Sequence, residues 1–295
     1  IMQHIEEAGI HSGDSACVLP AYELSSKARK TIENYTQQLA LNLKTVGLIN
    51  IQFAMKNNVV YVIEVNPRAS RTIPFISKVI DVPLANLAAQ LAVNGKLSKM
   101  NLSAKTRNGL IAVKKPVFPF NKFPRQNVFL SPEMKSTGEV IGFDTHLGSA
   151  YAKAESGAGN SLPVNGTVFI SVNDSDKISI IPMARDFKEL GFVIIATEGT
   201  AQLLSENGVP ANPVFKVGEG RPNVVDAIKN GEVQLVVNTP LGAQSRFDEY
   251  EIGRSAIRYK VPAITTIAGA QAAIRGIRNI KSGSIQYRSL QEVFT

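Results

Sequence analysis

Two amides and a carboxylate lie on two strands that the sequence predicts in its first quarter. Segments 48–55 and 59–65 alternate apolar and polar residues and are joined by residues 56–58, as in a β-hairpin. Because successive strand residues point to opposite faces, Glu64 and Asn66 lie on the same face. An acid and an amide therefore project side by side.

Whether Gln52 joins this face depends on the length of the loop. A two-residue loop turns Gln52 away from Glu64, whereas a three-residue loop pairs it with Val62 and turns it toward Glu64. Asn58 tolerates the left-handed backbone that ends a three-residue loop. We therefore predict the three-residue loop, with Gln52, Glu64 and Asn66 converging.

These oxygen donors suit a hard divalent cation. Magnesium takes a few protein oxygens and leaves room for nucleotide phosphates, whose charge it offsets during phosphoryl transfer. Arg68 and Arg71 follow the second strand, where guanidinium groups can grip phosphate or carboxylate bidentately. The alternative is an exposed polar strand end followed by two surface arginines.

The second half of the chain alternates short apolar strands with helical patterns. Strands are predicted at 167–172, 192–196, 213–216, 233–238 and 263–266, and helices at 176–190, 200–207, 222–230, 248–259 and 269–278. Asp176 is expected to cap the first of these helices and Gly191 to end it. This alternation predicts a doubly wound parallel sheet that binds ligands beyond the carboxyl ends of its strands.

The first half is predicted to be of the α+β type. Together with the doubly wound sheet of the second half, this gives an α/β fold class overall. Ser25 or Ser26 is expected to cap a helix that runs to Leu43, and a second helix covers 84–94. The predicted domains are 1–155 and 166–295, joined by the small, polar linker 156–165. The linker lacks the third glycine and the preceding strand of a dinucleotide-binding loop.

The loops at the carboxyl edge of the predicted sheet carry residues suited to an anion. Thr197 and Thr200 flank a strand-to-helix turn, where hydroxyls and helix amides can hold a phosphate. The pocket is completed by Lys177, Lys216, Asn238 and Thr239. Each of these residues alone is more often a solvated lysine or a helix cap, so the prediction rests on the whole set.

Composition fits a globular protein of about two domains, with 295 residues, 44% of them hydrophobic and 19% charged. No apolar run approaches the ~20 residues of a membrane span. Glu6 and Glu7 lie where a signal peptide would be basic. The one cysteine permits no internal disulfide. We therefore expect a cytoplasmic protein with no membrane partner.

The net charge of the chain is +8, but its basic residues form no concentrated block and are not interleaved with aromatic residues. We therefore expect no nucleic-acid partner. A field around a site for phosphorylated small molecules explains the charge, and so does an ordinary solvated surface. The chain begins with Ile1 rather than methionine, and we expect it to be a fragment of a longer protein.

Residues 63–75, Ile-Glu-Val-Asn-Pro-Arg-Ala-Ser-Arg-Thr-Ile-Pro-Phe, resemble the metal-binding signature of the ATP-grasp enzymes in the form found in carbamoyl-phosphate synthase large subunits. The core Glu-x-Asn-Pro-Arg is shared with biotin carboxylase. Segments 4–16, 119–124 and 134–140 support the resemblance. The tail resembles the methylglyoxal-synthase-like domain of the same subunit, so the resemblance covers essentially the whole chain.

The resemblance implies site residues for a second ATP site, which phosphorylates carbamate. Gln52, Glu64 and Asn66 would bind Mg2+ or Mn2+, the first two also contacting ATP, and Arg68 would stabilise the transferring phosphoryl group. The stretch laid against the nucleotide would be Gly9, Ile10, His11 and Ser12. From the residues alone, His11 is equally a loop histidine whose bonds are made within the protein.

The resemblance further implies a role in pyrimidine or arginine biosynthesis and three partners: a small glutamine amidotransferase subunit, the rest of the large subunit and a nucleotide effector (UMP, IMP or phosphoribosyl pyrophosphate). An oligomer is compatible with it. Half of the nucleotide clamp would precede Ile1, so we expect the isolated chain to have no enzymatic activity.

The family pattern also limits the effector. Members activated by ornithine have acids that match Glu6 and Asp14, a further acid in place of Lys115 and a tyrosine in place of Ala263. Because this chain has gained a lysine and lost an acid there, we expect it to repel ornithine. Pro240 replaces a threonine that helps to hold the nucleotide in some members, which leaves the nucleotide effector open.

Three other interpretations are open. Methylglyoxal synthases have a catalytic aspartate in a Gly-Gly-Asp-Gln run, but segment 241–244 reads Leu-Gly-Ala-Gln, so the general base is missing. A biotin-carboxylase-type enzyme shares the hairpin but not the tail. The third is a binding module, such as a regulatory nucleotide-binding domain attached to another ATP-grasp ligase or carboxylase.

Overall fold

A computed structural model describes residues 1–100, 102, 109–120, 122–123, 128, 130–239 and 246–294. The chain forms two compact units. Unit 1 contains Ile1–Gln3, Val18–Leu110 and Arg288–Thr295, and unit 2 contains His4–Cys17 and Ile111–Tyr287. The division into 1–155, 156–165 and 166–295 stays a prediction.

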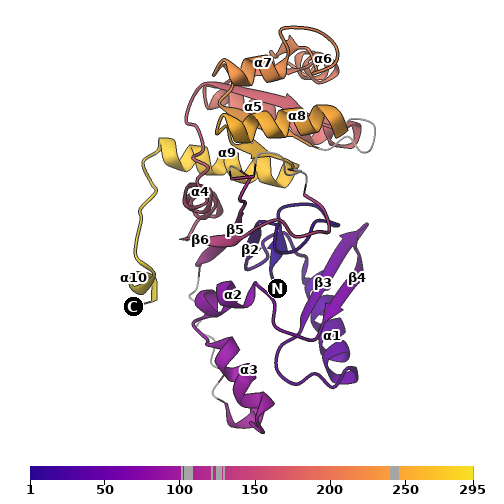
Figure 1. Cartoon of the computed structure of the whole chain (residues 1–295), viewed down its shortest axis with the longest axis vertical. Helices are drawn as coiled ribbons and strands as arrows, with labels where there is room; N and C mark the ends of the chain where they lie inside the picture. Colours follow the sequence, from indigo (N-terminus) through magenta and orange to yellow (C-terminus); the bar gives the residue numbers. More distant parts are fainter. Residues whose placement is uncertain are drawn as a thin grey trace. The chain divides into compact units, whose positions relative to one another are not determined.

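Unit 1 carries an antiparallel hairpin and several helices (Figure 1). Ser25 caps the first helix, since its Oγ accepts a hydrogen bond from the Ala28 amide at 3.2 Å, as predicted. The second predicted helix is also present. The helices Ile73–Ile80 and Leu290–Phe294 were not predicted; the first has Pro74 in its first turn, where proline costs no hydrogen bond. The elements are α1 (Ser26–Asn42), β3 (Asn50–Lys56), β4 (Val59–Asn66), α2 (Ile73–Ile80), α3 (Leu84–Ala92), the 3-10 turn η1 (Leu97–Lys99) and α10 (Leu290–Phe294).

The loop between β3 and β4 has two residues, so the predicted three-residue loop is wrong. Lys56 pairs with Val59, and only Asn57 and Asn58 lie between them. Their φ angles are 51° and 60°, so both adopt the left-handed conformation that the tightest hairpin turn requires. The prediction gave this role to Asn58 alone and overlooked that a second asparagine adopts it equally well.

A β-bulge nevertheless brings Gln52 opposite Glu64. The register runs regularly from the turn to the pair Phe53 and Val62, and then skips Ile63, so that Gln52 pairs with Glu64. An extra residue on one strand reverses the facing of everything beyond it. The predicted convergence is therefore present, for a reason other than loop length.

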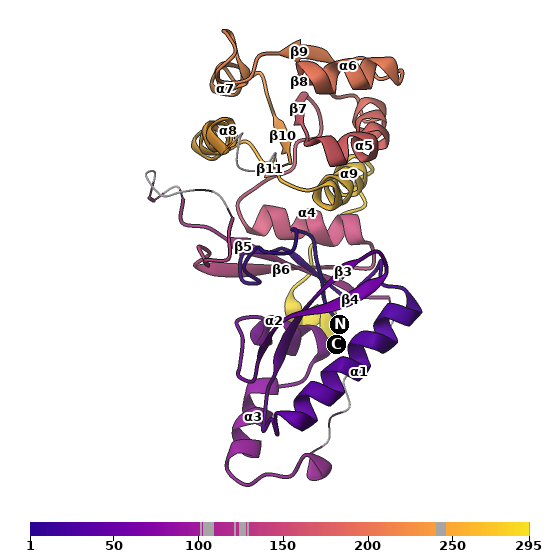
Figure 2. The same cartoon turned by 90° about the vertical axis from the view of Figure 1, so that its right-hand side faces the viewer.

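Unit 2 contains an antiparallel pair, a buried helix and a parallel sheet. The pair is β5 (Ile111–Val117) and β6 (Gly138–Asp144). The short strands β1 (Gln3–His4) and β2 (Cys17–Leu19), at the two ends of segment 3–19, complete a sheet of order β1-β2-β5-β6. Helix α4 (Leu147–Gly157) lies between β6 and α9 (Ile267–Lys281) (Figure 2). Its residues 147–152, 154 and 155 are all buried.

Glycines allow this helix to pack closely on both sides. A Cβ on Gly142 of β6 would meet the Ala150 carbonyl oxygen of α4, and a Cβ on Gly148 would lie 2.5 Å from the Arg275 backbone carbon of α9. In both cases the added Cβ would lie closer to the neighbouring atom than Cβ atoms approach other atoms in folded proteins. The close packing of α4 against β6 and α9 thus depends on glycine, which has no side chain, at positions 142 and 148.

The parallel sheet of unit 2 has the strand order β11-β10-β7-β8-β9 with every pair parallel, which confirms the predicted doubly wound sheet. Helices α7 and α8 cover one face, over a core that includes Phe169 and Val236, and α5, α6 and α9 cover the other (Figure 2). The remaining bounds are β7 (Thr167–Ser171), η2 (Asp174–Asp176), α5 (Lys177–Glu189), β8 (Val193–Thr197), α6 (Glu198–Glu206), β9 (Asn212–Val214), α7 (Val224–Lys229), β10 (Leu235–Asn238), α8 (Arg246–Arg258) and β11 (Ala263–Ile264).

The predicted cap of α5 is wrong in its chemistry. Asp176 occupies the cap position, but its side chain makes no capping bond. Asn173 caps the preceding turn η2 instead, with its Oδ1 accepting from the Asp176 amide at 3.0 Å. Gly191, with φ at 87°, follows α5 as predicted.

Among the described residues, no single helix is long and apolar enough to span a bilayer; α2 and α3, bent by 112° relative to each other, pass that test of length and composition only as a pair.

Candidate functional site

The polar face of the hairpin β3–β4 in unit 1 is built around a carboxylate flanked by amides. Gln52 lies directly across the ladder from Glu64, and Asn50 lies across from Asn66. The Asn66 Nδ2 donates to Glu64 Oε1 at 3.0 Å. Glu64 is exposed, whereas Gln52 and Asn66 are half-buried, so the carboxylate faces the open side of the hairpin.

Arg68 extends this row of polar side chains. Its Nη2 lies 3.5 Å from Asn66 Oδ1, its Nη1 donates to the Ala69 carbonyl at 3.0 Å, and its amide donates to the Asn66 carbonyl at 2.8 Å. The backbone turn after β4 therefore carries the guanidinium group back toward the amide. Carboxylate, amide and guanidinium form one contiguous polar surface.

The donor set on this surface fits a hard divalent cation. One carboxylate and neighbouring amide oxygens leave most of a six-oxygen shell to phosphate and water, as Mg2+ prefers. In the part of the chain that the structure describes, no group of three or more His, Cys, Asp or Glu side chains is placed to bind a metal. A metal in unit 1 would therefore depend on amides as well as on Glu64.

The stretch Gly9–Ser12 belongs to unit 2 and forms a loop held by its own bonds. His11 Nδ1 accepts from the Gly13 amide at 3.0 Å, and the His11 amide donates to the Ser131 carbonyl at 2.9 Å. The fully buried Lys114 donates to the Ser12 carbonyl at 3.1 Å. The ring nitrogen that faces Gly13 is therefore an acceptor within the protein.

Lys115 lies in a largely buried cluster with two acids of unit 2. Its Nζ is 2.7 Å from Glu155 Oε1, and only 13% of its side chain is exposed. Burial lowers the pKa of Lys115, but Glu155 and Glu6 outweigh it and leave the pKa raised. Burial raises the pKa of Glu6, against Lys115 and a hydrogen bond from Ser15. The ammonium group is thus paired with Glu155, and its charge also reaches Glu6.

The predicted anion pocket lies at the carboxyl edge of the parallel sheet. Thr197 ends β8 and precedes α6, and its Oγ1 donates to Thr200 Oγ1 at 3.4 Å. Both residues are buried. The Lys177 Nζ would lie 4.0 Å from a Cβ on Gly199, in the first turn of α6. Lys177 and the two threonines therefore surround the amino end of one helix.

The other three residues lie at the same edge of the sheet: Lys216 comes two residues after β9, Asn238 ends β10 and Thr239 follows it. Thr239 is fully buried, and its Oγ1 accepts from the Asn173 amide at 3.0 Å and from its Nδ2 at 3.2 Å. Its acceptor capacity serves the loop after β7. Pro240 and segment 241–244, on which the nucleotide and methylglyoxal-synthase comparisons depended, lie outside the described residues.

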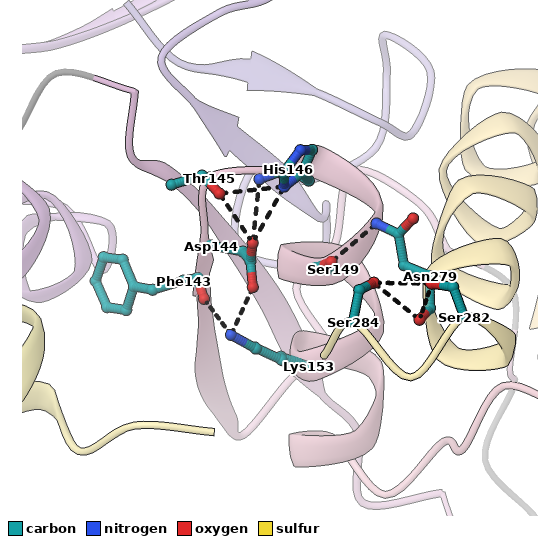
Figure 3. Close-up of polar contacts among 9 residues, drawn as sticks. All are labelled: Phe143, Asp144, Thr145, His146, Ser149, Lys153, Asn279, Ser282 and Ser284. Atoms are coloured by element: carbon teal, nitrogen blue, oxygen red, sulfur yellow. Dashed lines mark hydrogen bonds and ion pairs between the residues drawn. The ribbon is translucent and has the colours of Figure 1, made fainter. Parts of the chain in front are cut away.

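A further polar cluster joins β6 to α4 and has a structural role (Figure 3). Lys153 of α4 donates to Asp144 Oδ2 at 2.7 Å and to the Phe143 carbonyl at 2.8 Å. Burial raises the pKa of Asp144, but the bonds from Lys153 and the His146 amide outweigh it and leave the pKa lowered. In the same view, Asn279 of α9 donates to Ser149 Oγ at 2.8 Å.

Two residues beside these surfaces were not among the predicted site residues. Asn50 follows from counting two positions back from Gln52 along β3. Asp174 is three residues before Lys177, a spacing at which charged side chains meet, and its Oδ1 lies 2.7 Å from Lys177 Nζ. Both signals were present in the sequence.

Two protein families match different parts of this chain. Residues 2–100 match the family described as carbamoyl-phosphate synthase L chain, ATP binding domain. Residues 179–265 match the family described as MGS-like domain. The second match falls on the parallel sheet of unit 2 and confirms the predicted fold class of the tail.

Curated relatives named carbamoyl phosphate synthase large chain are similar over nearly the whole sequence. Identity is 53% over 297 residues with that of Acidobacterium capsulatum, 53% over 293 with that of Archaeoglobus fulgidus and 49% over 297 with that of a Nostoc species. Each alignment covers 99% of this chain and 27% of the relative, so the chain spans about a quarter of their length. A solved methylglyoxal synthase from Elizabethkingia anophelis NUHP1 is 17% identical, with TM-score 0.31 over 38% of this chain and 79% of its own.

Proposed function

We propose that this chain, which carries both of these domain families, is the carboxy-terminal part of a glutamine-dependent carbamoyl-phosphate synthase large chain. In this proposal unit 1 contributes the metal-binding hairpin of the ATP site that phosphorylates carbamate, and the parallel-sheet domain binds a regulatory nucleotide. The observation that carries it is the pairing of Gln52 with Glu64 beside Asn66 on a segment that matches an ATP-binding domain.

The hairpin would act by holding Mg2+ or Mn2+ against the phosphates of ATP, with Gln52, Glu64 and Asn66 as oxygen donors. The metal, when bound, offsets negative charge as the phosphoryl group moves. Asn66 contributes to orientation as well, because its bond to Glu64 Oε1 fixes one oxygen of the carboxylate. Gly9, Ile10, His11 and Ser12 would contact the nucleotide.

Arg68 would stabilise the transferring phosphoryl group. It already lies within 3.5 Å of the Asn66 amide, so a phosphate held at the hairpin comes within reach of its guanidinium fork. Preorganised positive charge of this kind lowers the barrier, because charge spreads over the equatorial oxygens in the transition state.

The regulatory site would hold a phosphate at the start of α6. The helix amides, Thr197 and Thr200 supply hydrogen bonds, while Lys177 and Lys216 supply charge. Asn238 would complete the pocket, and Thr239 would help mainly by fixing Asn173. UMP, IMP and phosphoribosyl pyrophosphate all carry the required group. Ornithine should be excluded, because the positive charge of Lys115 already reaches Glu6, one of the acids that would hold its ammonium.

Calorimetric titration of the 295-residue chain with these four compounds tests the regulatory site. At least one phosphorylated compound should bind, more weakly as salt rises. Lys216→Ala with Thr200→Ala should reduce that affinity, while Lys229→Ala, at the far end of α7, should not. Binding of ornithine with failure of every phosphorylated compound would remove the regulatory assignment.

The remaining features belong to the same proposal. The partners would be a small glutamine amidotransferase subunit and the rest of the large chain, in the cytoplasm, serving pyrimidine or arginine biosynthesis. A methylglyoxal synthase is disfavoured because segment 241–244 contains no acid. A biotin-carboxylase-type enzyme is disfavoured by the match of residues 179–265 to the MGS-like family.

A further inference from the structure

The Lys177 ammonium at the proposed phosphate site already contacts a carboxylate of its own chain. Asp174 Oδ1 lies 2.7 Å from Lys177 Nζ. The same Nζ would lie 4.0 Å from a Cβ on Gly199, the second residue of α6. Lys177, which lies near the start of that helix, is therefore already paired with the Asp174 carboxylate in the absence of a ligand.

Lys216 shows the same arrangement. Its Nζ lies 3.6 Å from Glu219 Oε1, and its amide donates to Glu219 Oε2 at 3.3 Å. The charge of Lys216 also reaches Asp174, whose pKa is lowered first by the Lys177 bond and further by Lys216. Two lysines and two acids thus form a neutral set at this edge of the sheet.

These acids contribute little to the stability of the loops that bear them. The side chain of Asp174 is 91% exposed and that of Glu219 is 49% exposed, and exposed ion pairs are weak. The loop after β7 is held by Asn173, which accepts from the Asp176 amide and donates its own amide to Thr239 Oγ1. Removal of the Asp174 charge leaves these bonds intact.

We propose that Asp174 is an internal competitor of the phosphate ligand, which holds Lys177 while the pocket is empty and releases it when a phosphate binds. Glu219 has the same role toward Lys216 through a longer contact. This inference rests on the proposed function, since it concerns the regulation of that same site. Binding exchanges one anion for another, so affinity is set by what the ligand gains from the α6 amides and hydroxyls.

Competition of this kind has an electrostatic signature. Asp174→Asn keeps the shape of the side chain and removes its charge, and should tighten binding of UMP, a dianion, by about 3- to 10-fold at low salt. The gain for cyclic UMP, a monoanionic phosphodiester, should be smaller, because the repulsion between Asp174 and the ligand scales with ligand charge whereas the release of Lys177 is the same for both ligands. Both gains should shrink as ionic strength rises.

The experiment is a calorimetric titration of the 295-residue chain with UMP and cyclic UMP. Asp174→Glu, which keeps the charge, is one control. Asp186→Asn is the matched control, since it removes the same charge from an ion pair of α5, 3.2 Å from Arg278. Support for the proposal requires tighter binding by Asp174→Asn and changes within about twofold for both controls.

The outcomes separate this inference from the function on which it rests. Equal or weaker UMP binding by Asp174→Asn, with binding by the wild type intact, would overturn the competitor role alone. An equal gain from Asp186→Asn would also overturn it, because the cause would be net charge. If neither the wild type nor Asp174→Asn binds UMP, IMP, phosphoribosyl pyrophosphate or inorganic phosphate, the regulatory site falls, and the competitor with it.

Discussion

Gln52 lies directly opposite Glu64 because the strand that carries Glu64 has one residue more than its partner requires. The two-residue turn alone would pair Gln52 with Ile63, and the bulge removes Ile63 from the ladder. Bulges commonly re-aim side chains next to functional sites. The alignment of the two oxygen donors is thus produced by the irregularity in the hairpin.

The turn of this hairpin should depend on its left-handed residues. Asn58 has a φ of 60°, so Asn58→Val should lower the free energy of unfolding by about 1 to 2 kcal/mol, while Asn58→Gly should change it by less than about 1 kcal/mol. Urea unfolding measures both. Equal stability of the two variants would contradict the turn geometry.

The sequence predicted most elements, but it predicted the facing of Gln52 in the hairpin from the wrong loop length and not from the bulge. The parallel sheet could be predicted, because β-branched runs alternate with segments of helical period, and each such helix supplies the crossover that parallel strands need. A bulge has no comparable periodic pattern in the sequence. Nothing in the residue types around Ile63 indicates that it is unpaired. Likewise, α4 was missed because its glycines and alanines lack an apolar stripe, being buried on nearly all sides.

Packing of α4 against α9 should not tolerate a single added methyl group at Gly148. Gly148→Ala places a carbon 2.5 Å from the Arg275 backbone, and we expect a loss of about 1 to 3 kcal/mol or more in the free energy of unfolding. Gly157→Ala, in the same helix with 3.5 Å to its nearest neighbour, is the matched control. Thermal unfolding of both variants checks this, and equal effects would argue against the close packing.

Lys115 should be needed for stability. Lys115→Met leaves Glu6 and Glu155 without their shared cation and should cost about 3 to 5 kcal/mol of unfolding free energy. Adding Glu155→Gln to this variant should recover part of the loss, since the stranded charge is removed. Urea unfolding of the four variants of this cycle gives the coupling energy. Additive effects would mean that the pair does not interact.

Stability should depend on the protonation of His4 in weak acid. Burial, with help from Lys114, lowers the pKa of His4 from 6.5 to about 4. Between these values the unfolded chain binds a proton that the folded chain does not, so folding loses stability as pH falls from 6.5 to 4, by up to about 3 kcal/mol. Glu6 titrates in the opposite sense, so the quantity to measure is the difference between the wild type and His4→Gln. If their unfolding free energies run parallel across this range, His4 is not responsible.

The measurement that tests the central claim most directly is made in a complete large chain carrying this sequence, paired with the proposed glutamine amidotransferase subunit, since the curated relatives are about four times as long as this chain. Glu64→Gln should lower carbamoyl phosphate formation by at least about 100-fold, because a metal-bound transition state loses several kcal/mol. Glutamine hydrolysis should stay within a few-fold, and Glu33→Gln, an exposed acid of α1 in the same unit, should change neither rate. Undiminished carbamoyl phosphate formation by Glu64→Gln, or an equal loss of both activities, would contradict the assignment of the hairpin to carbamate phosphorylation.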